Sequence, residues 1–407
     1  MSCRACPVFA ALCRMVRFSS QMRFLQRQSL ILTVSLAAST CKDAAAPPDT
    51  GPLRFVRISA GFSHTCALTV SGKAYCWGYD NYYQLGMRLN DNPPGFPLAV
   101  PGGHLFKSIS TGWLYTCGIT LDGRAYCWGG SYYGAVGPIP QNYTCDGVPC
   151  VEGPYLAGGS NRFQDVVAGD TYTCGRLIDQ NILCWGTLDG LMGGNGPYLS
   201  ISAGFPGCAI TLDSLGYCWG PNERGRVGDS TNIARQVPAP VYGGLKFVQM
   251  NASDQDSCGI VSAGPLYCWG FNTAGQFGIG AADESAHVTP RLAAPGFSFT
   301  SIALGYLTTC GIAPDQTTYC WGGNSWGNVG DGTFDVRLVP TLVTGGLKFV
   351  SISVGNGHTC GITTDSLAYC WGSNGDGQLG VDPRNQGSNP RSPIPVLVSR
   401  QLLPLGR

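Results

Sequence analysis

Short runs of alternating apolar and polar residues fill most of the chain, and glycine-rich turns separate them. Each repeating unit opens with a run such as LRFVRISAG or LKFVSISVG, continues with a cysteine-bearing run, and then has a third run ending in Cys-Trp-Gly. A fourth, proline-containing stretch such as IPVLV closes the unit. A period of two in β-branched and aromatic residues between turns predicts strands. The pattern therefore predicts an all-β fold with four strands per unit.

The unit recurs seven times, and each copy has two cysteines ten residues apart with a Trp-Gly directly after the second. Most successive copies lie 50 to 57 residues apart, measured from cysteine to cysteine. Four-stranded units of about 50 residues in a tandem array are typical of β-propellers. Residues 53–398 are therefore predicted to form a seven-bladed β-propeller.

Two units depart from this regular pattern. In unit three, Cys184 is only 34 residues from Cys218, and no run matches a fourth strand, so blade three is expected to be shortened. Unit two has an insertion, PQNYTCDGVPCVEG, with Cys145 and Cys150 at its neck. These two cysteines are expected to form a disulfide that closes a small loop.

The spacing of the repeated cysteines suits a hairpin. In CGITLDGRAYC, a three-residue connection centred on Asp122 places Cys117 opposite Cys127. Opposed residues have Cβ atoms close to the separation that a disulfide spans, so one hairpin disulfide is predicted per blade. Buried free thiols are the alternative. The predicted pairs are Cys66–Cys76, Cys117–Cys127, Cys174–Cys184, Cys208–Cys218, Cys258–Cys268, Cys310–Cys320 and Cys360–Cys370.

The turn of this hairpin needs a residue in the left-handed conformation, which glycine adopts at little cost. Gly123 supplies it in unit two, and Gly72 and Gly264 are its only counterparts. The other units have a different residue type there, so a different turn is expected in them. Those residues are Gln180, Ser214, Gln316 and Ser366.

Twenty cysteines are far more than a chain kept in a reducing cytosol uses for disulfides, so export is expected. Residues 22–41 have a basic start, an apolar stretch and small residues before Cys41, as a secretory signal does. The ending AASTC resembles a bacterial lipoprotein signal, which predicts lipidation of Cys41, with plain cleavage as the alternative. The predicted location is the bacterial cell envelope, with a lipid anchor as the only membrane attachment. The remaining segments are predicted to be an upstream extension (1–21), a flexible tether (42–52) and a C-terminal tail (399–407).

The formal charge of +1 conceals an asymmetry. Residues 1–41 hold five arginines and no acidic residue, which leaves 20 basic and 24 acidic residues, a net charge of −4, in the rest of the chain. A mildly acidic body without a basic stripe argues against binding to nucleic acid.

The repeat resembles the regulator-of-chromosome-condensation repeat family, whose fold is a seven-bladed propeller. The resemblance covers about residues 53–398 and rests on framework residues of the first and last units. These are Gly61, His64, Trp77, Gly78 and Gly86, and Gly355, His358, Trp371, Asn374, Gly377, Gln378, Leu379 and Gly380. Other units replace the histidine by Tyr115, Tyr172, Pro206, Asp256 or Thr308, and the first glycine by Ser253. The founding member is a nuclear exchange factor for a small GTPase, and an exported chain would not meet such a partner.

Residues suited to catalysis are sparse. His64 and His358 occupy the same repeat position, which favours a framework hydrogen bond. The stretch GNSWG, residues 323–327, matches the GxSxG pattern of a nucleophile elbow, but it is the unit-six form of the loop after Trp-Gly. No catalytic residue, metal site or cofactor is expected.

Aromatic residues gather instead in particular loops. If successive strands run antiparallel, the 1–2 and 3–4 loops of every blade share one face, and the 2–3 turns lie on the other. Exposed rings on a fixed framework are typical of a recognition surface, and packing on neighbouring blades is the alternative. The candidate binding residues are Phe62, Tyr82, Tyr83, Trp113, Tyr132, Tyr133, Tyr143, Phe205, Tyr306 and Trp326.

The function predicted from these observations is non-catalytic binding of an unidentified protein partner through the aromatic loop face. Binding of carbohydrate or cell-wall glycan is the first alternative, because tyrosine and tryptophan rings also stack on sugars. Guanine-nucleotide exchange and a hydrolase or lyase in the central channel are further alternatives. Clustered acid, base or metal ligands would be needed for the last of these.

Overall fold

The computed structural model describes residues 52–89, 95–139, 144–187, 196–202, 204, 206–262 and 264–399. They form seven antiparallel sheets, the seven-bladed β-propeller that the repeats predict. The predicted extension, the signal with Cys41, and the tether before Pro52 lie outside the described residues, as does the tail after Ser399. No helix among the described residues is long and apolar enough to cross a membrane.

The first three blades differ in strand number. Blade one comprises β1 (Phe55–Ala60), β2 (His64–Thr69), β3 (Ala74–Gly78) and β4 (Leu98–Ala99). Blade two comprises β5 (Phe106–Thr111), β6 (Tyr115–Thr120), β7 (Ala125–Gly130), the 3-10 helix η1 (Tyr132–Gly134), β8 (Thr144–Cys145) and β9 (Val148–Leu156). Blade three has only β10 (Phe163–Ala168), β11 (Tyr172–Leu177) and β12 (Ile182–Gly186) among its described residues, as its short repeat predicts.

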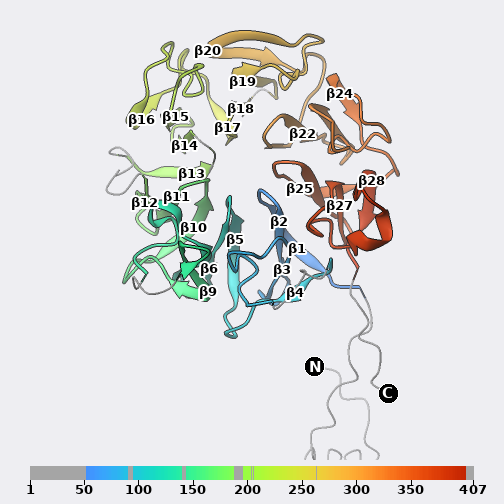
Figure 1. Ribbon diagram of the computed structural model, residues 1–407. Helices are drawn as coiled ribbons and strands as arrows, with labels where there is room; N and C mark the ends of the chain where they lie inside the picture. Colours follow the sequence, from blue (N-terminus) through green and yellow to red (C-terminus); the bar gives the residue numbers. More distant parts are fainter. Residues whose placement is uncertain are drawn as a thin grey trace, which may run out of the picture. The chain divides into compact units, whose positions relative to one another are not determined.

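The other four blades are regular. Blade four comprises β13 (Tyr198–Ser202), β14 (Gly207–Thr211), β15 (Gly216–Gly220) and β16 (Arg235–Pro240), and blade five β17 (Phe247–Ala252), β18 (Asp256–Val261), β19 (Leu266–Asn272) and β20 (Asp283–Ala293). Blade six comprises β21 (Ser301–Leu304), β22 (Thr308–Ile312), β23 (Thr318–Gly322) and β24 (Arg337–Leu342). Blade seven comprises β25 (Phe349–Val354), β26 (His358–Thr363), β27 (Ala368–Ser373), the 3-10 helix η2 (Pro383–Gln386) and β28 (Arg391–Leu397). The fourth strands β16, β20, β24 and β28 lie on the outside of the ring (Figure 1).

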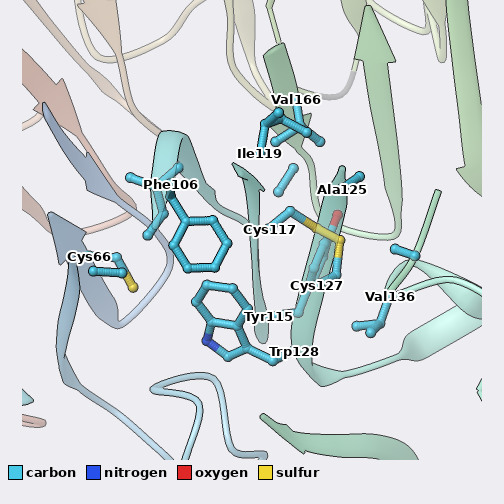
Figure 2. Close-up of a cluster of buried hydrophobic side chains, with 14 of the residues drawn as sticks. Cys66, Phe106, Tyr115, Cys117, Ile119, Ala125, Cys127, Trp128, Val136 and Val166 are labelled. Atoms are coloured by element: carbon cyan, nitrogen blue, oxygen red, sulfur yellow. A yellow bond between two sulfur atoms is a disulfide. The ribbon is translucent and has the colours of Figure 1, made fainter. Parts of the chain in front are cut away.

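A disulfide joins the second and third strands of every blade. Cys117 pairs directly with Cys127 in the ladder between β6 and β7, with Cα atoms 4.0 Å apart and sulfur atoms 2.07 Å apart. The predicted pairs in the other six blades are also bonded, as are Cys145 and Cys150 of the insertion. The bonds lie in the cores of the blades, close to the packed rings of Phe106 and Trp128 in blade two (Figure 2).

The turn between these strands is common to all the units whose turns the structure describes, contrary to the difference expected from sequence. Gly123 has a φ of 87°, and Gln180 and Ser214, which replace glycine, have φ values of 71° and 69°. Gln316 and Ser366 each have a φ of 66°. The left-handed conformation costs a non-glycine residue about 1 kcal/mol. The strand pairing and the disulfide on either side hold the turn closed, so the sequence tolerates this cost.

Adjacent blades are joined by a recurring arrangement that we call the carbonyl clasp. Trp128 Nε1 donates to the carbonyl oxygen of Gln84 in the preceding blade at 3.0 Å, and Thr116 Oγ1 donates to the same oxygen at 2.9 Å. Each such bond contributes about 1 kcal/mol net. The same two donors and one acceptor recur as Thr65 and Trp77 on Gln378, Thr173 and Trp185 on Ala135, Ser257 and Trp269 on Arg226, Thr309 and Trp321 on Gln276, and Thr359 and Trp371 on Asn328.

The junction between blades three and four differs from the rest. Gly207 stands where the other blades have the hydroxyl donor, and the described residues offer Trp219 no acceptor carbonyl. A Cβ at Gly207 would meet the Trp219 ring at 2.8 Å, so this junction is packed too closely for a threonine. The Tyr172 hydroxyl instead donates to the Gly204 carbonyl of blade four.

Ring closure relies on the clasp and on packing, because each sheet is built from one continuous repeat. Phe55 and Trp77 of blade one share a core with Ile362 and Leu379 of blade seven. His358 adds a hydrogen bond from Nε2 to Thr65 Oγ1 at 2.8 Å across the same junction.

Candidate functional site

The 1–2 and 3–4 loops of each blade lie together, as the antiparallel strand order predicts. In blade one, Tyr79 N, at the start of the 3–4 loop, donates to Ser63 O of the 1–2 loop at 2.9 Å. In blade two, Gly130 N donates to Leu114 O at 2.8 Å. We call this side of the propeller the loop face and the side with the 2–3 turns the turn face.

Rings from blades one and two meet on the loop face. Trp113 stacks on Tyr132 with centroids 5.4 Å apart and planes 25° apart. Phe62 contacts the Trp113 ring edge-on at 6.1 Å, and Tyr82 contacts the Tyr132 ring at 6.4 Å. The chain of contacts ends at Tyr79 and Tyr133. We call the six residues Phe62, Tyr79, Tyr82, Trp113, Tyr132 and Tyr133 the aromatic cluster.

The cluster is only partly covered by the protein. Tyr133 is 71% exposed and Phe62 is 43% exposed, whereas Trp113, Tyr82 and Tyr132 are half-buried against one another. The rings therefore pack across a blade junction and also leave an open aromatic surface.

Backbone conformation sets the loop of blade one apart. Tyr83 has a φ of 64° and occupies the place that glycine fills in the corresponding loops, as Gly134 in blade two and Gly377 in blade seven. A bulky residue is rarely left-handed, and such residues concentrate at functional sites. Tyr133, directly before Gly134, is also left-handed, with a φ of 55°. Two adjacent loops thus hold aromatic residues in a conformation that side chains disfavour.

The remaining predicted residues do not join this cluster. Tyr306 and Trp326 are 41% and 48% exposed, and neither contacts a ring among the described residues. Tyr143 and Phe205 lie outside the described residues. Sequence analysis missed Tyr79, whose position directly after Trp77-Gly78, beside Tyr82, could have identified it.

Acidic residues border the aromatic cluster. The disulfide-closed insertion lies beside it, because Ser131 N at the start of the Tyr132 loop donates to Pro149 O at 2.6 Å. The pKa of Tyr79 is raised, first by burial and then by the nearby carboxylates of Asp376 and Asp146. The ring surface thus has a negatively charged edge.

The 1–2 loops also surround a depression at the centre of the loop face. Its lining includes Phe62, Asp170, Asp254, Tyr306 and Asn356. Burial raises the pKa of Asp170, and the neighbouring Asp254 partly offsets this rise. The depression adjoins the aromatic cluster through Phe62.

Polar groups inside the propeller have framework roles. His64 Nε2 bonds Thr116 Oγ1 at 2.9 Å across the junction of blades one and two, as predicted from its repeat position. Complete burial lowers the pKa of His64 and of His358 to about 3, so both are neutral at physiological pH. In GNSWG, Asn324 Oδ1 accepts from Val329 N at 2.9 Å and closes the loop. Among the described residues, no three His, Cys, Asp or Glu side chains are arranged to hold a metal ion.

The loop face of blades four and five is charged and self-paired. Arg226 pairs with Glu223, and Arg224 lies 3.5 Å from Glu284. The Arg224 guanidinium also lies over the Phe271 ring, 4.3 Å from its centroid. These charged side chains interact mainly with one another, whereas blades one and two expose aromatic rings to solvent.

Comparison with known proteins assigns the chain to a family. A model of the regulator of chromosome condensation (RCC1) repeat matches residues 55–84, 106–135 and 349–378, and a second model of this repeat matches residues 315–362. The ultraviolet-B receptor UVR8 of Arabidopsis thaliana is 30% identical over an aligned length of 322 residues, and the match covers 72% of this chain and 70% of UVR8.

Solved structures share the fold. Prp20p of Saccharomyces cerevisiae has a TM-score of 0.71 at 14% identity, covering 86% of this chain and 88% of Prp20p. The ectodomain of the receptor kinase CR4 of Physcomitrella patens has a TM-score of 0.53 at 22% identity, covering 78% of this chain and 73% of that one. The repeats, the propeller and the UVR8 similarity together establish that this chain belongs to the regulator of chromosome condensation (RCC1) repeat family.

Proposed function

We propose that this chain is a binding scaffold that holds a protein partner on the aromatic cluster. The observation that carries the proposal is the continuous series of ring contacts from Phe62 through Trp113 to Tyr132, which ends in the exposed Tyr133. Tyrosine and tryptophan dominate the energetic centres of protein interfaces, because they bury a large area at a small cost in side-chain entropy.

Two further features support this role. Rings already fixed by mutual packing lose little freedom on binding, which lowers the cost of association. The left-handed Tyr83 and Tyr133 cost folding stability where glycine would not, and function on this surface would explain their retention. Prp20p of Saccharomyces cerevisiae, which shares this fold, binds Gsp1p and histones, so the fold supports protein binding in that protein.

We also propose that the chain acts in the bacterial cell envelope after export, held by a lipid on Cys41. The eight disulfides support export, because such bonds persist in oxidising compartments. Metabolic labelling with an alkyne fatty acid tests the anchor. The wild-type chain should incorporate the label, and the Cys41→Ser variant should not. An unlabelled wild-type chain would instead favour cleavage of the signal without lipidation of Cys41.

Partner capture from envelope extract tests the binding role. The full chain should retain a specific protein, and the double variant Trp113→Ala, Tyr133→Ala should lose it. Arg224→Ala, in the loop position of blade four that corresponds to Tyr133, is the matched control and should retain it. Equal capture by all three chains would contradict the proposal. Retention of wild type on cell-wall polysaccharide, with no protein captured, would favour the glycan alternative.

A further inference from the structure

The turn face has an unexplained apolar feature in the first position of the 2–3 turns. This position carries an exposed aliphatic side chain in four consecutive blades. The residues and exposed fractions are Val70 (78%), Leu121 (62%), Ile178 (60%) and Leu212 (55%), and we call them the aliphatic arc. A single exposed aliphatic residue is ordinary, but the same position filled in four successive blades is a pattern.

The remaining blades do not continue the arc. The same turn position holds Ser262 in blade five, Pro314 in blade six and Thr364 in blade seven. The backbone contact is nevertheless kept in blades five and seven, because Ser262 N donates to Lys246 O and Thr364 N donates to Lys348 O, as Leu121 N donates to Leu105 O in blade two. The aliphatic residues are therefore not required by the turn itself.

The polypeptide enters the propeller on the turn face. Phe55 N, at the start of β1, donates to Ser366 O in the 2–3 turn of blade seven at 2.8 Å. The described residues therefore begin on this side, next to the Val70 end of the arc. A membrane anchor attached to the chain before Pro52 would hold the turn face, rather than the loop face, toward the bilayer.

The charge around the arc suits anionic lipid headgroups. Lys73, Lys107 and Arg162 border it and form no ion pair among the described residues. Two of the acidic residues that follow the aliphatic residues are paired, Asp122 with Arg124 at 3.2 Å and Asp213 with Lys246 at 3.6 Å. Asp179 is the third acid, and its carboxylate accepts hydrogen bonds from Asn181. Basic residues in this sector therefore exceed acidic ones.

We propose that the aliphatic arc rests on the surface of a lipid bilayer, with the four side chains in the interfacial layer and the bordering cations on anionic headgroups. Separate apolar side chains at the tips of turns, flanked by lysine and arginine, match the combination that holds peripheral proteins in this layer. The inference rests on the proposed envelope location and adds an orientation to it: the aromatic cluster faces away from the membrane.

Photocrosslinking to lipid tests this orientation with the full chain. Vesicles of phosphatidylcholine and phosphatidylglycerol carry a phospholipid with a photoreactive group near the headgroup, and mass spectrometry locates the crosslinks. Crosslinks should fall on the 2–3 turns of blades one to four, and the turns of blades five to seven should be free of them. The quadruple variant Val70→Ser, Leu121→Ser, Ile178→Ser, Leu212→Ser should lower the yield at these turns about tenfold.

A matched variant controls for general loss of apolar surface. Leu292, Val339, Leu342 and Ile394 lie on the fourth strands and are 46–55% exposed, so changing these four residues to serine should leave the crosslinks unchanged. The converse variant Ser262→Leu, Thr364→Leu should add crosslinks in blades five and seven. Crosslinks on the loop face, an unchanged yield in the quadruple arc variant, or no crosslinks from a chain that sediments with the vesicles would each overturn the proposal. The last two results would leave partner binding by the aromatic cluster intact.

Discussion

Blades two and four place the same loop position on the loop face and fill it with different chemistry. Tyr133 precedes the loop glycine in blade two and is 71% exposed, next to a stack of rings. Arg224 precedes it in blade four, where it is paired with Glu284 and lies over Phe271. The framework beneath both loops is the same, because Ala135 O in blade two and Arg226 O in blade four each accept from the clasp tryptophan of the next blade, and both blades have a hairpin disulfide. The difference indicates that the repeat determines the scaffold, whereas the residues at this loop position vary between blades and can determine binding.

Removal of a hairpin disulfide should have the largest effect, and it should be equal in the two regions. The double variants Cys117→Ala, Cys127→Ala in blade two and Cys208→Ala, Cys218→Ala in blade four should each lower the free energy of unfolding by up to about 3 kcal/mol, because the unfolded chain loses a closed loop. Chemical denaturation of the non-reduced proteins measures the free energy of unfolding of each variant and of the wild type. A much larger loss in one blade would show that the framework is not equivalent beneath the two loops.

Truncation of the central ring should come next and should separate the regions. Trp113→Ala removes the ring between Phe62 and Tyr132, and affinity for the captured partner should fall about 100-fold. Arg224→Ala should change affinity less than about twofold, because a surface ion pair contributes little. Titration with the purified partner measures the affinity of each variant, and thermal unfolding checks that both variants are folded. Equal losses of affinity in the two variants would contradict the separation of the regions.

A buried acid distinguishes the 3–4 loop of blade one, which also contributes to the aromatic cluster, from the loop of blade four by its response to pH. Asp80 stands where blade four has Asn222, and burial raises the pKa of Asp80 to about 7. The folded chain then holds a proton that the unfolded chain releases near pH 4, so the Asp80 contribution to stability falls as pH rises from about 4 to 7. Asp80→Asn should therefore be more stable than wild type at pH 8, by about 1 kcal/mol or more, and nearly equal to it at pH 4. An equal difference at both pH values would contradict the raised pKa.

Restoring glycine at the strained position should give the smallest effect, with opposite signs for stability and binding. Tyr83→Gly should raise the free energy of unfolding by about 0.5–1 kcal/mol, because glycine accepts a φ of 64° without a steric cost. The same variant should weaken partner binding, since it removes a ring beside the cluster. Higher stability with unchanged binding would mean that Tyr83 has no part in recognition.

The fold could be predicted from sequence because its determinants are local and repeated. Cys117 and Cys127 identify their hairpin by spacing alone, and the short unit three correctly indicates a blade with three described strands. The left-handed Gln180 was not predictable, since the tertiary frame imposes a conformation that the residue itself disfavours.

The candidate site was only partly predictable, because it depends on contacts between units. Sequence grouped ten aromatic residues on one face but could not indicate that Trp113 stacks on Tyr132, while Tyr306 and Trp326 stand apart. The carbonyl clasp was missed for the same reason: its donors and its acceptor belong to different repeats.

The most direct test of the binding role is photocrosslinking from one loop position in two blades. A photoreactive amino acid replaces Tyr133 in one chain and Arg224 in another, and each chain is irradiated in its native envelope. A discrete crosslinked protein is expected from position 133 and none from position 224. The same protein crosslinked equally from both positions, or only from position 224, would contradict the assignment of recognition to the aromatic cluster.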